Sequence, residues 1–386
     1  MGFFSGRVAF QRFRVLNKPP RQFGPDHLDR LKGQAVGKQR VASSDGVEAG
    51  WIAGDHILDT RFDLAKNIVN DTLHFALRMD KNKIPGDLLR AYTAIELEGI
   101  AAGNPSGMPS QKQRKEARMQ ARDKLEKELA DGRYLQRKMY PLLWDCQSGE
   151  LLVGTTSKGA IDRMITLFQQ TFGHGLEALS AGVRAYRLAE ARERGRNVED
   201  AEPSSFLPNV KLPVMAWAPD EASRDFLGNE FLLWLWYVLD AEADTIALED
   251  KSEVAVMLAR SLTLECPRGQ TGRETIQSDA PGRLPEARQA IRAGKLPRKV
   301  GLTLVRHEQQ YELTLAAETL AVAAGKLPAP ENVEEERTRL EERVGQLRDL
   351  LETLDLLYDA FGQRRFSPDW AKELSKIRKW MHKEEE

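Results

Sequence analysis

Apolar and polar residues alternate along several stretches of the chain in the way that half-buried β-strands do. Two stretches predict single strands and two predict hairpins: residues 3–16, residues 72–79, residues 139–154 and residues 299–318. Each hairpin pattern consists of two apolar runs around a short polar turn, which reads QSGE in the first. Residues 50–54 (GWIAG) predict another extended segment. In the second strand, alternation places four side chains on one face: Leu73, Phe75, Leu77 and Met79.

A period of about 3.6 residues replaces the alternation elsewhere and predicts helices. We expect helices at residues 26–32, 85–97, 111–131, 158–172, 226–240 and 340–361. The helix at 158–172 has four apolar residues on the side that we expect to be buried: Ile161, Ile165, Leu167 and Phe168. Helices mixed with strands that pair as hairpins predict an α+β fold with an antiparallel sheet.

The helix predicted at 111–131 has clear ends. Ser110 is a favourable N-cap residue, and Gln113 stands where a reciprocal capping box needs it. Gly132 accepts the left-handed conformation that often ends a helix. The rod between them is about 30 Å long. Small and apolar side chains line one of its faces at every fourth position: Ala117, Ala121, Leu125 and Leu129.

Positive charge is concentrated on and after this helix, although the whole chain has a net charge of −1. Arg114, Arg118 and Arg122 form a stripe beside the apolar face. Ten basic residues lie in this region: Lys112, Arg114, Lys115, Arg118, Arg122, Lys124, Lys127, Arg133, Arg137 and Lys138. Five acidic residues oppose them, which leaves a local excess of +5. Such an excess favours an anionic partner, although a charged helix can also be plain solvated surface.

A second basic cluster precedes the later hairpin and contains Arg288, Arg292, Lys295, Arg298 and Lys299. If the fold brings the two clusters together, they form one positive field. No aromatic residue interrupts the Lys/Arg stripe, so phosphate contact with a duplex is more natural than stacking on single-stranded bases. The sequence offers no set of side chains for reading base edges, and we expect binding to be independent of DNA sequence.

Composition indicates a globular chain that is 41% hydrophobic and 30% charged. The two cysteines, Cys146 and Cys266, lack the spacing of a zinc site and fit a reducing cytosol. The longest apolar run, residues 231–239, is too short to span a bilayer, and no signal-peptide pattern precedes it. We therefore expect a cytoplasmic protein with no membrane partner.

Enzymatic motifs are mostly missing. Residues 154–161 (GTTSKGAI) lack the Lys and the hydroxyl residue that a phosphate-binding loop needs. One acidic group, Asp240, Glu242 and Asp244 followed by Glu249-Asp250-Lys251, has the form used by magnesium-dependent nucleases. A solvated acidic loop explains the same residues more simply. We expect a protein that is not an enzyme and needs no cofactor or metal, with a DNA nuclease as the alternative.

The last helical pattern has apolar residues at alternating spacings of four and three, which is a heptad seam. Its members are Leu340, Val344, Leu347, Leu351, Leu354, Tyr358 and Phe361. The seam packs either on the protein's own sheet, which we favour because it is short, or on another chain. The second option predicts a protein-interaction scaffold that docks through Leu347 and Leu354.

Several of these patterns occur in an order that resembles the bacterial recombination-associated protein RdgC family. The order begins with GWIAG, TLHFALRM, IPGDLL and a Lys/Arg-rich helix, followed by KMYPLLWD and GELLVGTTSKGAIDRMITLFQQTFG. Downstream, FLGNEFLLWLW, IRAGKLPRKVGLTL, YELTLAAE and the closing Leu-rich helix are also similar to that family. The similarity covers most of the chain by pattern rather than by close identity.

The resemblance implies a ring-shaped homodimer that encircles double-stranded DNA and modulates strand exchange by a RecA-type recombinase, in the cytoplasm at the nucleoid. It places Lys112 to Lys138 on or near a helical projection that helps close the ring. The second cluster, represented by Arg292, Lys295, Arg298 and Lys299, would face the hole from another domain.

Together these patterns predict a central domain with an antiparallel sheet, a helical basic projection, and a second α+β domain that ends in a long helix. The expected segments are 1–84 and 139–180 for the central domain, 85–138 for the projection, 181–227 for an insertion or linker, 228–330 for the second domain, and 331–386 for the long C-terminal helix and charged tail. We expect the charged residues after position 371 to fray.

Overall fold

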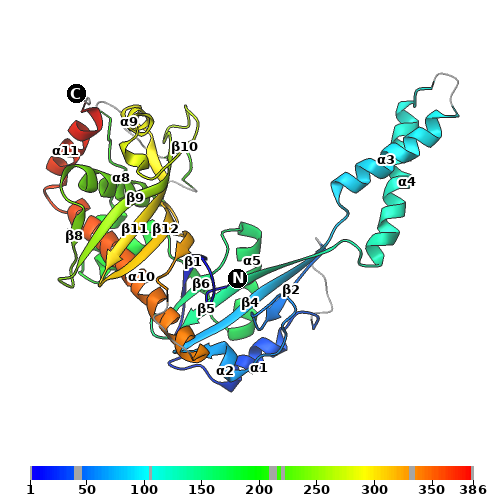
Figure 1. The fold of residues 1–386 in the computed structure, drawn as a ribbon, viewed down its shortest axis with the longest axis horizontal. Coiled ribbons are helices and arrows are strands. Elements are labelled where there is room, and N and C mark those ends of the chain that lie inside the picture. Colours follow the sequence, from blue (N-terminus) through cyan, green and yellow to red (C-terminus); the bar gives the residue numbers. More distant parts are fainter. Residues whose placement is uncertain are drawn as a thin grey trace. The chain divides into compact units, whose positions relative to one another are not determined.

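The computed structural model describes residues 2–38, 46–103, 107–207, 215–218, 222–329 and 335–383. The chain divides into two compact units. Unit 1 comprises residues 1–24, 64–74 and 141–386, and unit 2 comprises residues 25–63 and 75–140. The chain passes from one unit to the other after residues 24 and 63 and within strands β4 (Thr72–Asn82) and β5 (Leu135–Asp145), which are labelled in Figure 1.

Unit 1 is built on an antiparallel sheet in which hydrogen-bonded neighbours follow the order β10-β9-β11-β12-β13-β1-β6-β5. The bounds of these strands are β1 Val8–Val15, β6 Glu150–Val153, β9 Glu253–Glu265, β10 Glu274–Ser278, β11 Leu296–Arg306, β12 Gln309–Ala316 and β13 Val322–Lys326. Three short strands flank the sheet: β3 Ile68–Val69, β7 Leu176–Ala178 and β8 Thr245–Ala247. Both predicted hairpins are present, as β5–β6 and β11–β12.

Helices pack on this sheet and on one another. Their bounds are α2 Leu64–Asn67, α5 Lys158–Phe172, α6 Ala181–Glu190, α7 Gly195–Glu199, α8 Phe226–Ala241, α9 Pro285–Arg292, α10 Glu336–Arg365 and α11 Trp370–His382, with a 3-10 turn at Pro281–Arg283. The tryptophan-rich helix α8 is buried from Phe226 to Val238 and packs against β9, β11, α6, α10 and α11. Its dense apolar sequence therefore supplies the centre of the core.

The heptad seam lies inside unit 1. Val344, Leu347, Leu354, Tyr358 and Phe361 on α10 are all buried, and α10 contacts α6, α8 and β3. This confirms the packing of the seam on its own chain. Leu347 and Leu354 are 1% and 6% exposed, so neither side chain is accessible to a separate protein.

Unit 2 contains helix α1 (Pro25–Gly33), strand β2 (Val47–Ile52), the longer part of β4, and two helices that project from the ends of β4 and β5. These helices are α3 (Gly86–Ala101) and α4 (Gln111–Ala130) (Figure 1). Strand β4 pairs antiparallel with β2 from Ala76 to Lys81. It is buried on both faces from Thr72 to Arg78, where alternation predicts burial of one face only.

Three expectations need correction. The tail forms helix α11, in which Ile377, Trp380 and Met381 are buried, because its apolar residues fall on one face; residues 384–386 lie outside the described part. The segment 181–227, expected as an insertion or linker, contains α6 and α7 and buries Ala181 and Val198. Its residues 208–214 and 219–221 lie outside the described residues.

The third correction concerns α5. Leu167 and Phe168 are buried as expected, and Met164 and Phe172 are buried as well. Ile161 and Ile165, which we expected to be buried, are only partly buried. Helix α5 is therefore rotated relative to the sequence-based expectation. The fold class is confirmed: the chain is α+β, with an antiparallel sheet and a long helix, α10, near its C-terminus.

Candidate nucleic-acid interface

Helix α4 has the ends and the packing face that its sequence predicts. The Ser110 hydroxyl accepts the Gln113 N–H, and the Gln113 side chain accepts the Ser110 N–H, which completes the capping box. Gly132 has φ +73°, the left-handed conformation that glycine adopts without strain. Ala117, Ala121 and Leu125 are fully buried against the rest of the hairpin. The opposite side of α4 is free to face solvent.

Two side-chain contacts fix how α3 and α4 lie against each other. The Tyr92 hydroxyl donates to Glu128 at 3.3 Å, and Lys124 pairs with Glu96. These contacts place the middle of α3 beside the C-terminal half of α4.

All ten basic side chains predicted between 112 and 138 are exposed. Four of them form ion pairs: Arg122 with Glu126, Lys124 with Glu96, Arg133 with Glu128 and Asp131, and Arg137 with Asp80. Within the described part of the chain, the other six make no ion pair: Lys112, Arg114, Lys115, Arg118, Lys127 and Lys138. The first three turns of α4 thus keep most of their positive charge available.

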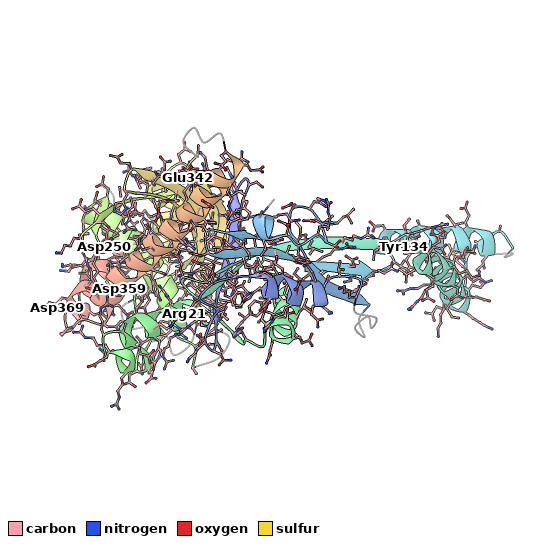
Figure 2. The ribbon with its side chains drawn as sticks, turned by 90° about the horizontal axis from the view of Figure 1, so that it is seen from below. Arg21, Tyr134, Asp250, Glu342, Asp359 and Asp369 are labelled. Carbon is pink, nitrogen blue, oxygen red and sulfur yellow. The ribbon has the colours of Figure 1, made fainter. Side chains whose placement is uncertain are left out.

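A polar network holds the base of the hairpin. Asp80 of β4 accepts two hydrogen bonds from Arg78 and lies 3.5 Å from Arg137. The Asn82 amide donates to the Leu129 carbonyl at 2.8 Å, which satisfies one open carbonyl at the end of α4. Tyr134 (labelled in Figure 2) donates to Glu128, and this hydrogen bond is the main reason that the pKa of Tyr134 rises to about 12.

Most basic residues of the second predicted cluster form ion pairs or hydrogen bonds within unit 1. Arg288 pairs with Asp240 and lies over the rings of Trp236 and Trp380. Arg292 donates to the Lys383 carbonyl, and Lys295 is 5% exposed and pairs with Glu274. Arg298 pairs with Glu265 and Glu318. Lys299 is the member that is exposed and has no ion pair among the described residues.

Of the cluster, Arg288, Lys295 and Arg298 are neutralised by carboxylates, Arg292 donates to a carbonyl, and Lys299 is the exposed member without an ion pair among the described residues. The sequence did not reveal this, because the carboxylates that neutralise the cluster lie on β9, β10 and α8, and one follows β12. Cluster 288–299 belongs to unit 1 and the basic helix to unit 2.

Four of the five acids predicted for a nuclease site pair with separate basic residues, and Asp244 accepts a hydrogen bond from the Thr245 hydroxyl. Asp240 accepts hydrogen bonds from Arg288 and Trp380, Glu242 pairs with Arg364, and Glu249 pairs with Arg192. Asp250 pairs with Arg306, and the Ser252 hydroxyl is the main cause of its lowered pKa. Within the described ranges, no group of three His, Cys, Asp or Glu is arranged to hold a metal ion. The geometry therefore gives a metal-dependent nuclease no support.

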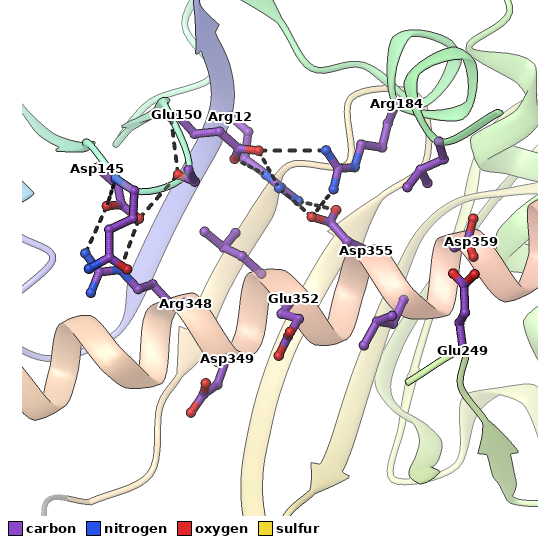
Figure 3. Close-up of a pocket in the computed structure, with 15 residues that line it drawn as sticks. Arg12, Asp145, Glu150, Arg184, Glu249, Arg348, Asp349, Glu352, Asp355 and Asp359 are labelled. Carbon is purple, nitrogen blue, oxygen red and sulfur yellow. Dashed lines mark hydrogen bonds and ion pairs between the residues drawn. The ribbon is translucent and has the colours of Figure 1, made fainter. Parts of the chain in front are cut away.

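A charged cleft of about 670 Å³ lies along α10 in unit 1 (Figure 3). On its floor, Arg12 of β1 donates to both carboxylate oxygens of Glu150 and to both of Asp355, at 2.7–2.9 Å. Arg184 of α6 reaches the same two acids, and Arg348 pairs with Asp145 at 2.9 Å. These pairs tie α10 to β1, β5, β6 and α6.

The burial of Arg12 decides what this network does. Arg12 is 4% exposed, and burial alone would lower its pKa. The charges of Asp355 and Glu150 outweigh burial and raise the pKa, so Arg12 is fully protonated. Protein carboxylates thus neutralise the cations on the cleft floor, and the network holds α10 against the neighbouring strands and α6. Nothing in the sequence signals it, because Arg12 and Asp355 are 343 residues apart.

Within the described ranges, no helix is long and apolar enough to cross a membrane. Comparison with protein-family models gives no match to this chain, and comparison with curated proteins gives none either.

Proposed function

We propose that the protein binds double-stranded DNA without sequence preference through the basic side of α4. One observation carries this proposal: Arg114, Lys115 and Arg118 are exposed on the first turns of α4 and have no ion pair among the described residues. Phosphates neutralise such charges and release condensed counterions, which supplies affinity without reading bases. The flanking helix α3 and the network around Asp80 support α4 as a rigid rod.

The wider proposal follows the resemblance to the RdgC family. It comprises a homodimer that forms a ring around duplex DNA, acts in the cytoplasm at the nucleoid, and modulates strand exchange by a RecA-type recombinase. Exposed Lys299 of unit 1 is the member of the second cluster that we retain as a DNA contact. A DNA nuclease is not favoured, because four of the five acids of the candidate group form ion pairs with four different arginines.

Charge reversal on α4 tests the binding site. The variant Arg114→Glu/Arg118→Glu/Arg122→Glu keeps the buried face of α4, so the fold should survive while duplex binding falls by at least about 100-fold at moderate salt. A matched control, Lys372→Glu/Lys376→Glu/Lys379→Glu, makes the same charge change on exposed positions of α11 in unit 1. The control should keep most of the affinity. Equal losses in both variants would move the site away from α4.

A further inference from the structure

The first three turns of α4 carry their cations on one side. At about 100° per residue, Arg114, Lys115, Arg118 and Arg122 fall within an arc of about 100° around the helix axis. The acids of these turns and the next, Glu116 and Asp123, fall about 80° or more outside that arc. From Arg114 to Arg122, this side of α4 carries cations and no acid over about 12 Å.

The positive side of α4 is exposed on the first turns of the helix. The contacts with Tyr92 and Glu96 of α3 lie on the C-terminal half of α4, whereas Arg114 and Lys115 are exposed on its first turns. Arg114 lies three residues before the buried Ala117, and its own side chain is exposed. On these turns only the face of α4 around Ala117 is covered, and the remaining circumference is open.

The dimensions of such a rod match one feature of B-form DNA. The major groove is about 12 Å wide and about 8.5 Å deep and admits an α-helix, whereas the minor groove is about 6 Å wide and does not. A helix with side chains measures about 10–12 Å across. Between residues 111 and 120, Ala117 is the one buried residue of α4, so the exposed side of these turns is open to a groove.

We propose that the N-terminal half of α4 enters the major groove of the duplex. Arg114 and Arg118 contact the phosphates of one groove wall, and Lys115 and Arg122, at the other border of the arc, contact those of the other. Gln111, exposed in the middle of the arc, and Met119, 59% exposed near its border, face the base edges. This inference rests on the proposed DNA binding and adds the groove and the depth of contact.

Filling one groove at a time tests the inference. The probe is a duplex whose cytosines carry glucosylated hydroxymethyl groups, which fill the major groove, compared with an unmodified duplex of the same sequence. Affinity for the glucosylated duplex should be at least about tenfold lower, because the helix can no longer enter. Saturating the minor groove of the unmodified duplex with netropsin should change affinity by less than about twofold.

Equal affinity for both duplexes, or displacement by netropsin, would overturn groove entry while leaving the proposed DNA binding in place. Failure to bind any duplex would overturn the proposed function itself.

Two single variants with the same charge change provide a second measurement. Arg118→Glu lies in the positive arc, and Lys127→Glu lies outside it on the same helix; both side chains are exposed and make no ion pair among the described residues. We expect a loss of about tenfold for the first and less than about threefold for the second; equal losses would contradict the orientation of α4.

Discussion

At the scale of single residues, the most consequential group outside α4 is the buried guanidinium of Arg12. Its charge is balanced by Glu150 and Asp355, which come from β6 and α10. Removing one partner of a buried pair is costly because the remaining charge keeps its desolvation penalty. Asp355 also holds Arg184, so it is the member whose loss affects most partners.

We expect Asp355→Ala to lower the free energy of unfolding of unit 1 by about 3 kcal/mol. Chemical denaturation followed by tryptophan fluorescence measures this change, since α8 and α11 carry tryptophans in unit 1. The control is Asp200→Ala, which removes the exposed Asp200–Arg196 pair. Exposed pairs contribute little, and this variant should stay within about 0.5 kcal/mol of the native protein. A change in Asp355→Ala as small as in the control would show that the Arg12 network does not hold α10.

Cys266 predicts a dependence of stability on pH. Burial would raise the pKa of its thiol, but the backbone N–H groups of Arg268, Thr271 and Gln270 outweigh burial and lower the pKa to about 7. The ordinary pKa of this thiol is 9.0. A group whose pKa is lower in the folded state stabilises the fold above its unfolded pKa and loses that contribution as pH falls through the folded value.

The free energy of unfolding should therefore rise between about pH 7 and about pH 9 through this group. Cys266→Ser removes the titrating thiol while keeping a small polar side chain, and it should remove this part of the rise. Denaturant titrations at several pH values, run on both proteins under reducing conditions, provide the measurement. Identical pH profiles for the two proteins would exclude a lowered thiol pKa.

At the scale of elements, the hairpin of α3 and α4 depends on a narrow contact of small side chains. Ala117 and Ala121 are fully buried, while Met119 between them is 59% exposed. An aspartate at position 121 would be buried without a partner in this contact, which disfavours packing of α4 on α3.

Ala121→Asp should increase hydrogen exchange along α4 by more than about tenfold and reduce DNA binding in parallel, with exchange in unit 1 unchanged. Met119→Asp places the same side chain two residues away on the exposed side and should leave exchange of α4 close to native. Protected α4 amides in Ala121→Asp would mean that the contact with α3 does not order the helix.

Elements with local signals were the ones that sequence predicted well. The capping box at Ser110, the left-handed Gly132 and the hairpin turn at 146–149 are each encoded within a few neighbouring residues. Elements whose environment is set by distant partners were predicted less well. Strand β4 is buried on both faces, and α5 buries Met164 where Ile161 and Ile165 were expected, because alternation and period do not say what covers the second face.

The candidate site also has features that the sequence predicts and features that distant partners determine. The exposure of the α4 cations was predictable, because long charged side chains stay in solvent while Ala117 and Ala121 supply the packed face. The neutralisation of Lys295 and Arg298 was not, since Glu274, Glu265 and Glu318 lie on or beside other strands. The charged cleft was missed for the same reason: Arg12, Glu150 and Asp355 meet only in the folded chain.

At the scale of the whole molecule, the proposed ring makes a topological prediction. A ring closed around DNA leaves a linear duplex through its ends but stays on a closed circle. After a rise in salt or addition of competitor, the protein should remain on closed-circular duplex much longer than on linear duplex of equal length. Sedimentation of the free protein checks that it is a dimer. Equal dissociation from circles and linear duplexes would contradict encirclement while leaving binding through α4 intact.

The central claim is that phosphates neutralise the cations on the positive side of α4, and the salt dependence of duplex affinity tests it most directly. With about five phosphate contacts per copy, the logarithm of the binding constant should fall with the logarithm of salt concentration with a slope of about −4 to −5. The neutral variant Arg114→Gln/Arg118→Gln/Arg122→Gln should make this slope shallower by about 3. A variant whose slope equals that of the native protein would show that DNA is held elsewhere and would contradict the account.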